Sequence, residues 1–439
     1  MTIRRVPEDF RVEELLTEAA QALVRPEPGP HALYHLTKKS LTTPNAISDL
    51  TRKLKVRPGD VAFVGLKDKH AVTSQYVTAR RGGDAPTALE GGAWQARRLG
   101  FLPRPLDADM VAGNRFILVV RGLSREASER MDEHIQLLAD PLLDPPGRRQ
   151  GEGACINEPR TSASGLPAAP LRSRLVESPP AASSLLVVNY FGDQRFGSAR
   201  HFQGFAAPYL IRGDFAQALK LTIATPSRKD KKDIKVFRQR LAAGWGDFQG
   251  VLPQLPRCAD RRAIEHLSRR PDDFRGAFVL LPYFTQQMAV YSYQSHLWNA
   301  IARRLLLEAC PDPRRRYEAD DPFGPMLFAA AQAVPAAWRD LDLPVPGRNT
   351  QPVEPWSRAA LAVLREEGLQ TFRDLKIPGV HRPFFGEAPR QWFMRAREFT
   401  LSQPQRDELE DRPHRLKRTV GFSLPRGGYA TVVLRALGQ

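Results

Sequence analysis

The sequence has few cysteines, no long hydrophobic run and fewer acidic than basic residues. Its three cysteines, Cys155, Cys258 and Cys310, are odd in number and widely spaced among 439 residues. Such spacing fits neither a disulfide framework nor a metal-ligand motif, so we expect a reducing, cytoplasmic environment. No apolar run approaches the roughly 18 residues of a membrane-spanning helix. No apolar segment follows Arg4 and Arg5, so we expect no signal peptide and no membrane anchor.

Motifs of metal and cofactor chemistry are also missing from the sequence. No glycine-rich phosphate loop stands between a strand and a helix, and no His-Glu-x-x-His pair or Gly-x-Ser-x-Gly elbow occurs. The paired Cys and His spacing of metal sites is absent as well. We therefore expect neither cofactor nor metal, which narrows the chemistry to reactions carried by side chains alone.

The charge balance favours a polyanionic partner. Lys and Arg number 65 against 48 Asp and Glu, which gives a formal net charge of +17. Most polyanionic partners of basic proteins are nucleic acids. The excess is rich in arginine, which pairs bidentately with phosphate and stacks on bases. We expect a nucleic acid as the partner. For the oligomeric state we expect a monomer.

Patterns in the first 140 residues predict alternating strands and helices. Residues 10–14 and 31–36 alternate like strands. Thr43 is a good N-cap and Pro44 a good first residue for a helix. The apolar face of this helix would carry Ile47, Leu50 and Leu54. Further expected elements are a strand at 115–121 buried on both faces and a helix capped by Ser124 with Met131, Ile135 and Leu138.

The composition and the hydrophobic spacing of the sequence change after about residue 140. Residues from about 140 to 184 are rich in Pro, Gly, Ser, Ala and Arg without periodicity, which predicts a flexible insertion. Helical spacing then predominates, most clearly at 288–308 and at 356–367, the latter closed by Gly368. Strand-like patterns return at 419–424 and 429–434.

This order of elements predicts an α+β protein in which one domain interrupts another. Its length alone makes two domains the prior expectation. We expect a first domain formed by the two strand-rich ends, residues 1–198 and 390–439. A helical-rich domain over residues 199–389 would be inserted into it.

The stretch from Gly65 to Gln75 is the strongest candidate for chemistry. It places Asp68 between Lys67 and Lys69, on a turn expected between two strands. Neighbouring ammonium groups favour the charged form of a carboxylate. An acid kept ionised beside lysines suits a reaction on an anionic substrate, although a lone aspartate in such a place is more often a solvated turn residue.

This stretch, GLKDKHAVTSQ, resembles the signature of the TruD family of pseudouridine synthases. Other stretches resemble the family in the same order. Residues 7–14 are similar to its N-terminal motif, residues 113–116 to its Gly-Asn-x-Phe strand and residues 189–197 to its Asn-Tyr-Phe-Gly element. Residues 293–299 resemble the Tyr-Gln-Ser helix of the archaeal and eukaryotic branch, and residues 422–435 resemble the C-terminal strand of the family. The likeness spans nearly the whole chain outside 140–184. It implies a pseudouridine synthase-type catalytic domain with a curved mixed or antiparallel sheet, interrupted by a TRUD insertion domain.

The resemblance implies isomerisation of uridine to pseudouridine in tRNA, with uridine 13 as the leading target. The C1′–N1 bond is broken, the uracil is turned and a C1′–C5 bond is formed. Nothing is oxidised and no group is lost, which agrees with the missing cofactor motifs. Asp68 would be the essential catalytic carboxylate, either bonding to the ribose or removing a ribose proton.

The resemblance also implies a pocket for a uridine that has left the RNA stack. Asn114 would hydrogen-bond the substrate, and Lys67 would favour the charged aspartate or face a phosphate. Phe10, Phe116 and Phe422 would line the pocket or stack on the base. Taken singly, phenylalanines on strands are usually core residues, so these assignments depend on motif position.

Some positions depart from the family pattern. Arg4 stands where a lysine is frequent, Ser40 where a glycine is common, and Val188 where a proline is usual. These departures concern loop geometry more than chemistry.

Two other functions remain open at this level. A non-catalytic RNA-binding protein or tRNA-folding chaperone would keep the positive charge without needing Asp68. A metal-free hydrolase of nucleoside bonds would usually require a second carboxylate, and none lies near these motifs in sequence.

Overall fold

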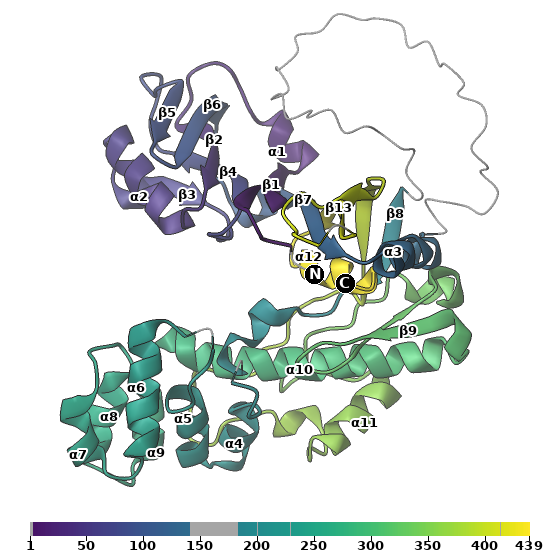
Figure 1. The fold of residues 1–439 in the computed structure, drawn as a ribbon. Helices are drawn as coiled ribbons and strands as arrows, with labels where there is room; N and C mark the ends of the chain where they lie inside the picture. Colours follow the sequence, from purple (N-terminus) through teal and green to yellow (C-terminus); the bar gives the residue numbers. More distant parts are fainter. Residues whose placement is uncertain (1–2, 141–182, 200, 229, 413) are drawn as a thin grey trace, which may run out of the picture. The chain divides into compact units, whose positions relative to one another are not determined.

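The computed structural model describes residues 3–140, 183–199, 201–228, 230–412 and 414–439 (Figure 1). The chain divides into two compact units. Unit 1 comprises residues 1–187, 395–430 and 437–439, and unit 2 comprises residues 188–394 and 431–436. Across the described ranges, none of the helices combines the length and hydropathy needed to cross a membrane.

The insertion expected at about 140–184 falls almost entirely outside the described residues. The two edges of this segment lie next to each other in the sheet region of unit 1. Asp140 N donates to the Ser184 carbonyl at 2.9 Å, and the buried Asp140 carboxylate lies 2.7 Å from Arg395 Nε. The predicted segment thus overlaps the described residues only at Asp140 and at residues 183–184.

Unit 1 is built on one mixed sheet of eleven strands. The strands are β1 (Phe10–Leu16), β2 (His31–Lys39), β3 (Val61–Phe63), β4 (Val72–Ala79), β5 (Ala88–Gly91), β6 (Trp94–Leu102), β7 (Val111–Leu123), β8 (Ser184–Val188), β11 (Phe393–Leu401), β12 (Gln405–Arg406) and β13 (Leu416–Pro425). Their order is β5-β6-β2-β4-β1-β7-β13-β11-β8, with β3 beside β4 and β12 beside β13. β1 and β4 run parallel, whereas β7 pairs antiparallel with both β1 and β13. The α+β fold with a mixed sheet is thus confirmed.

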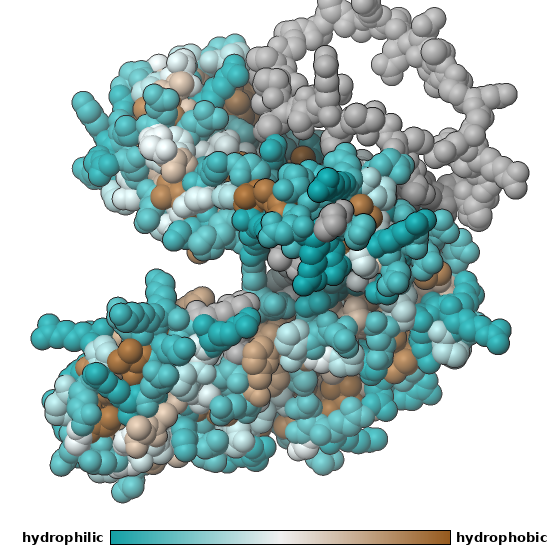
Figure 2. Space-filling view, in the orientation of Figure 1, coloured by the Kyte–Doolittle hydropathy of each residue, from teal (hydrophilic) through white to brown (hydrophobic). Residues whose placement is uncertain are grey.

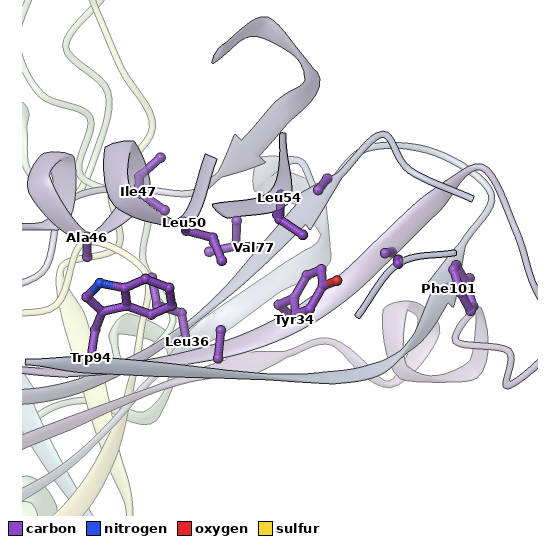
Figure 3. Packing of buried hydrophobic residues seen from close by; sticks show 13 residues of the cluster. Tyr34, Leu36, Ala46, Ile47, Leu50, Leu54, Val77, Trp94 and Phe101 are labelled. Atoms are coloured by element: carbon purple, nitrogen blue, oxygen red, sulfur yellow. The ribbon is translucent and has the colours of Figure 1, made fainter. Parts of the chain in front are cut away.

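Helix α2 (Thr43–Leu54) covers one face of the sheet. Its predicted apolar face points toward buried side chains of β2, β4 and β6 (Figure 3), namely Tyr34, Leu36, Val77 and Trp94. The cap is Thr42, whose side chain accepts a hydrogen bond from Asn45 N at 3.3 Å. The prediction that Thr43 caps this helix is wrong by one residue, because Thr42 has the extended backbone of a cap and Thr43 is already helical.

The opposite face of β2 carries Leu33, which packs with Ala20 of the short helix α1 (Glu18–Ala22).

Helix α3 (Arg125–Leu138) packs on β7 and β13. Ser124 caps it by accepting from Ala127 N at 3.1 Å, as predicted. The three residues predicted for its apolar face, Met131, Ile135 and Leu138, are buried.

Strand β7 alternates instead of being buried on both faces. Phe116 and Leu118 are buried, whereas Ile117 and Val119 are partly exposed. The prediction of full burial is therefore wrong, because β7 lies in an antiparallel ladder that packs fully on one side only.

Unit 2 is mostly helical. Its helices are α4 (Ala207–Arg212), α5 (Phe215–Ile223), α6 (Lys232–Ala243), α7 (Phe248–Val251), α8 (Arg261–Leu267), α9 (Phe274–Val279), α10 (Tyr283–Ala309) and α11 (Ser357–Glu366), with a hairpin of β9 (Arg316–Ala319) and β10 (Met326–Ala329). Both helices predicted here are confirmed. Tyr293 lies on the buried face of α10, and Gly368 closes α11 with a φ of +75°.

The strand predicted at 429–434 is wrong. Ala430–Ala436 forms a helix, α12, most of which groups with unit 2. The β-branched run from Thr431 to Val433 favours a strand on propensity alone. Burial of Val433 and Leu437 at helical spacing overrides that preference.

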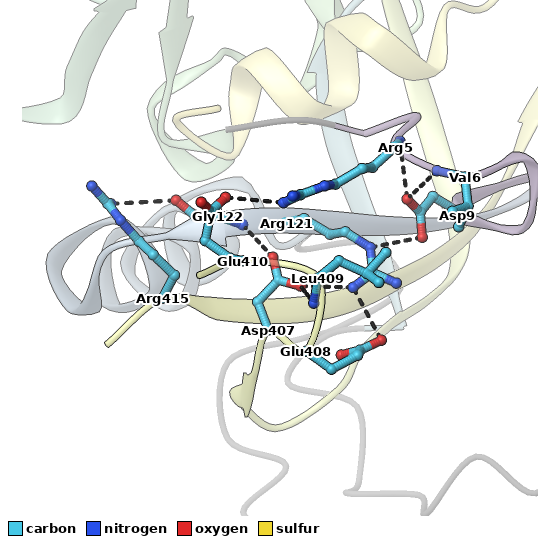
Figure 4. Close-up of polar contacts among 10 residues, drawn as sticks. All are labelled: Arg5, Val6, Asp9, Arg121, Gly122, Asp407, Glu408, Leu409, Glu410 and Arg415. Atoms are coloured by element: carbon cyan, nitrogen blue, oxygen red, sulfur yellow. Dashed lines mark hydrogen bonds and ion pairs between the residues drawn. The ribbon is translucent and has the colours of Figure 1, made fainter. Parts of the chain in front are cut away.

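A buried ion-pair network holds the N-terminal segment of unit 1 against β7 (Figure 4). Arg121 Nε donates to Asp9 Oδ1 at 2.9 Å, and Arg121 Nη1 donates to Asp407 Oδ1 at 2.8 Å. The other oxygen of Asp9 accepts from Arg5 N and Val6 N, each at 3.1 Å. These bonds fix the residues that lead into Phe10, the first residue of β1.

Hydrophilic side chains cover most of the face that Figure 2 shows, and hydrophobic ones appear there in small separate groups. A few large hydrophobic side chains are strongly exposed among the described residues. The most exposed are Leu66 and Phe284, each at 72%.

Candidate active site

Asp68 lies on the turn between β3 and β4, as the sequence predicts. Its Oδ1 accepts from the backbone N–H of His70 at 2.8 Å, which closes the turn. Its Oδ2 lies 2.9 Å from Arg4 Nη1. The side chain is 18% exposed, so the carboxylate is fixed in direction yet reachable from solvent.

The buried lysine Lys38 holds the backbone of the same turn. Lys38 is 1% exposed, and its Nζ donates to the Asp68 carbonyl at 2.8 Å. Burial lowers the pKa of Lys38 to about 8; the charge of Lys67 also lowers it, and the charge of Asp68 raises it. The sequence does carry a signal for this residue, because Lys38 falls on the same face of β2 as the buried Tyr34 and Leu36.

The start of helix α2 anchors the residue before Asp68. Lys67 N donates to Thr43 Oγ1 at 3.0 Å. The Thr43 hydroxyl in turn donates to Gln75 Oε1 at 3.2 Å in the interior. Thr43 therefore ties the turn to both α2 and β4.

The side chain of Lys67 points into the protein, toward β1 and β7. Its Nζ lies 2.7 Å from Glu14 Oε1 and donates to Asn114 Oδ1, also at 2.7 Å. Glu14 is fully buried, and its second oxygen accepts from Tyr76 N at 3.0 Å. Lys67 thus pairs with Glu14 and Asn114, and its ammonium group does not contact the Asp68 carboxylate.

Glu14 is a residue that sequence reasoning missed. In the register of β1 it follows Phe10 and Val12 on the buried face, where an acid is unusual. A buried acid needs a paired cation, and Lys67 supplies it. The break in the apolar pattern of β1 was the available signal.

Phe10, Phe116 and Phe422 come together as one aromatic row. Phe116 and Phe422 are directly opposite in the β7–β13 ladder, with ring centres 5.6 Å apart. The Phe10 ring meets Phe116 edge to face at 6.4 Å. All three are buried, and Phe422 is the least exposed at 1%, with Phe399 stacked at 6.4 Å.

Arg4 links this aromatic row to Asp68. Its Cζ lies 4.2 Å from the centre of the Phe10 ring, while its Nη1 makes the ion pair with Asp68. Asn114, two positions before Phe116 on β7, connects the row to Lys67. A continuous series of contacts therefore links the predicted site residues. It runs from Asp68 through Arg4 to Phe10, Phe116 and Phe422, and Lys67 of the same turn contacts Asn114. Sequence reasoning did not assign Arg4, Glu14 or Lys38 to this site.

Metal ligands and thiols play no visible part in this region. Within the described part of the chain, no group of three or more His, Cys, Asp or Glu side chains could hold a metal ion. Cys258 and Cys310 are free thiols in unit 2, and Cys155 lies outside the described residues.

The whole-chain comparisons agree with the motif at Asp68. The model of the tRNA pseudouridine synthase D (TruD) family matches residues 1–143 and 166–314. The chain belongs to the TruD family. The family predicted from the motifs is thereby confirmed, and TruD proteins are isomerases.

Similar TruD proteins come from bacteria and archaea. The tRNA pseudouridine synthase D of Aquifex aeolicus is 27% identical, over 99% of this chain and 97% of its own length. A probable tRNA pseudouridine synthase D of Methanopyrus kandleri is 28% identical, over 93% and 86%. The crystal structure of the putative TruD of Methanosarcina mazei matches with a TM-score of 0.67 at 23% identity, over 99% of this chain and 92% of that one, and so shares its fold.

Two departures from the TruD pattern have a clear place in the structure. Arg4, found where a lysine is frequent, is the cation that pairs with Asp68. Ser40, found where a glycine is common, has a φ of +53°, and its N–H donates to the Ala71 carbonyl at 3.3 Å. A left-handed backbone at that position explains why glycine suits it.

Proposed function

We propose that this TruD family member isomerises a uridine of tRNA to pseudouridine, with Asp68 as the reacting carboxylate. One observation carries the proposal: the Asp68 side chain is partly exposed on a turn whose contacts with Arg4, His70 and Lys38 fix its direction. Family membership supplies the reaction, and names of relatives such as the Aquifex aeolicus protein supply tRNA as the substrate.

In this proposal Asp68 and the side chains near it have different roles in the reaction. Asp68 bonds to C1′ or removes a proton from the ribose while the C1′–N1 bond breaks. The turned uracil then joins C1′ through C5, which displaces the Asp68 carboxylate or is followed by return of the proton to the ribose. C5 finally loses its hydrogen to solvent, and N1 takes up a proton. Arg4 holds the carboxylate in place. Asn114, whose oxygen accepts from Lys67, presents its amide NH₂ end to the substrate.

The aromatic row would form the wall of the uridine pocket. Phe10 and Phe116 would line it, and Phe422 would support Phe116 from behind, because Phe422 is almost fully buried. Lys67 keeps Asn114 oriented instead of binding phosphate, because its ammonium group is engaged with Glu14.

The division of the chain into two compact units, one formed by its ends and one by its middle, supports a two-domain assignment. We assign the catalytic domain to the chain segments expected at 1–198 and 390–439, and the TRUD insertion domain to 199–389. The net charge of +17 supports RNA as partner, with backbone contacts that weaken as salt rises. Uridine 13 as the target, a monomeric state and a cytoplasmic location complete the proposal.

A tritium-release assay tests the reaction directly. Transfer RNA labelled at C5 of its uracils should lose tritium in the presence of the protein, and mapping of the product should place pseudouridine at position 13. Asp68→Asn should lower the rate by at least about a thousandfold. Asp109→Asn, at a carboxylate whose side chain is 63% exposed, is the matched control and should react normally.

Other outcomes would identify other functions. No release by the intact protein, or equal release by Asp68→Asn, would contradict the proposal. Free uracil among the products would identify a hydrolase. Tight tRNA binding without isomerisation would identify an RNA-binding protein on the same fold.

A further inference from the structure

Leu66 is an exposed hydrophobic residue in the catalytic turn. It lies two positions before Asp68, and 72% of its surface is accessible. Single exposed leucines are common on proteins and need no explanation by themselves. This one is unusual because its neighbours Lys67 and Asp68 are held by specific bonds, and Leu66 alone in the turn projects a large apolar group into solvent.

The backbone fixes the direction of Leu66. Gly65 precedes it with a φ of +69°, a left-handed conformation that turns the chain sharply. Lys67 follows it, with its N–H bound to Thr43 at 3.0 Å and its side chain directed inward to Glu14. Leu66 is therefore presented outward by a fixed turn, and its exposure is built into the turn geometry.

The turn that carries Leu66 also carries basic groups. Lys69 and His70 in the same turn are exposed, and Arg4 beside Asp68 is partly so. Such groups attract the phosphates of RNA. RNA held by them would bring its bases within reach of the apolar side chain on this turn.

The proposed reaction needs such a group. A uridine must leave its stack before its ribose can reach Asp68, and unstacking costs a few kcal/mol. Proteins that open nucleic-acid stacks commonly insert an apolar side chain, leucine among them, into the gap. The inserted side chain is buried between bases, which offsets part of the unstacking cost.

We infer that Leu66 enters the gap left in the RNA stack when the target uridine turns out toward Asp68. Leu66 would then be a positioning residue that favours the flipped state of the RNA and makes no contact with the reacting atoms. This inference rests on the proposed function. It goes beyond it by naming the residue that opens the RNA.

The test compares Leu66→Ala, Leu66→Met and Leu99→Ala on a folded tRNA transcript. Leu99 is a matched control, because it is an exposed leucine on β6 of the same unit. We expect Leu66→Ala to lower the single-turnover rate about tenfold, because most of the buried leucine surface is lost. Leu66→Met should keep at least about half of the rate, and Leu99→Ala should match wild type within about twofold.

A second measurement separates stack opening from a change in the active site. In an Asp68→Asn background, which stops the reaction, a transcript carries 2-aminopurine next to the target uridine. Binding should raise its fluorescence, and adding Leu66→Ala should reduce that rise by at least about half, with the dissociation constant of the transcript changed less than about threefold.

The inference is overturned if Leu66→Ala reacts at the wild-type rate, or if its rate falls while the fluorescence rise is unchanged. An equal loss in Leu99→Ala would also overturn it. Failure of the proposed function looks different. The wild-type protein would then release no tritium, whereas the fluorescence comparison would still report whether Leu66 opens the stack.

Discussion

Arg4 Nη1 lies 2.9 Å from Asp68 Oδ2, although the two residues come from separate motifs of the sequence. The same guanidinium covers the Phe10 ring with its Cζ 4.2 Å from the ring centre. One side chain thus fixes the carboxylate and touches the aromatic wall of the proposed pocket.

Replacing Arg4 should therefore reduce activity with little effect on stability. Arg4→Met removes the charge that orients Asp68, and we expect kcat/KM to fall about 10- to 100-fold. Arg4→Lys should keep more of the activity, because lysine can still pair with the carboxylate. The neighbouring Arg5→Met, which breaks an ion pair with Glu410, is the control and should stay within about threefold of wild type. Equal losses in the Arg4 and Arg5 variants would contradict a specific role for Arg4.

Glu14 and Glu13 offer a matched pair for a stability test. Glu14 is fully buried and pairs with Lys67, whereas Glu13 is 34% exposed and lies 3.8 Å from Arg115. Glu14→Gln leaves the Lys67 charge without its partner, so we expect the free energy of unfolding to drop by about 3 kcal/mol. Glu13→Gln should change it by less than about 0.5 kcal/mol. Urea denaturation of both variants checks this, and similar costs at both positions would refute the buried pairing.

Lys38 should make stability depend on pH in the alkaline range. Burial lowers the pKa of Lys38 to about 8 from 10.5, so between these pH values the unfolded chain holds this proton more tightly than the folded chain. The contribution of Lys38 to the free energy of unfolding should therefore rise by about 3 kcal/mol between pH 8 and 10.5.

A Lys38→Met variant isolates that contribution. As pH rises through this window, the wild type should become more stable relative to Lys38→Met, as measured by the difference between their free energies of unfolding. Urea denaturation at pH 8, 9 and 10 measures it. A difference that stays constant with pH would show that Lys38 titrates normally. The variant should also lose activity about tenfold, since the Asp68 carbonyl loses its donor.

The Arg121 network predicts a large and pH-dependent stability cost. Arg121→Met leaves Asp9 and Asp407 buried without their cation, which should cost about 3–5 kcal/mol at pH 7. Burial raises the pKa of Asp407. Hydrogen bonds from Arg121, Leu409 N–H and Gly122 N–H lower it by more than burial raises it, so the pKa of Asp407 lies below its usual value. The wild-type network thus contributes stability above the usual pKa of a carboxyl, and that contribution is lost as pH falls through the lowered value.

The cost of Arg121→Met should accordingly shrink as pH falls, because burial raises the pKa of the unpaired Asp407 carboxyl in the variant and its protonation removes the buried charge. Denaturation at pH 7 and at a series of acidic values tests this. Arg125→Met, at an arginine that is 88% exposed, should cost less than about 0.5 kcal/mol at every pH. A cost for Arg121→Met that does not change with pH would point to lost packing instead of lost charge pairing.

Local sequence patterns correctly predicted helices whose apolar faces and caps are set by residues close together in the chain. The helix with Ile47, Leu50 and Leu54 and the helix capped by Ser124 formed as expected, because their apolar spacing and caps lie within a few residues. The helix at 430–436 was not foreseen. Its β-branched residues favour a strand, and only its packing against distant parts of the chain decides the outcome.

The candidate site was predictable where a motif carries it and unpredictable where distant segments meet. The motifs proposed Asp68, Asn114 and Phe116, and the contacts of Arg4 and Lys67 connect the segments that carry them. The partners Arg4 and Lys38 could not, because nothing in the sequence says which loops meet at the turn. Glu14 and Lys38 nevertheless left a trace, since each is a charged residue on the buried face of a strand. A charged residue that interrupts the apolar face of a predicted strand therefore indicates a buried polar contact, and its partner can be sought among other such residues in the sequence.

Strand β13 has a consequence for the order in which the protein becomes active during synthesis. Leu416–Pro425 pairs with β7, near the middle of the sheet, and brings Phe422 against Phe116. All of unit 2 up to Met394 is translated before this strand leaves the ribosome. A nascent or prematurely terminated chain contains the residues of the Asp68 turn but lacks the strand that places Phe422 against Phe116. In the proposed function, such incomplete copies would lack part of the uridine pocket, so that activity on RNA would begin only when the chain is complete.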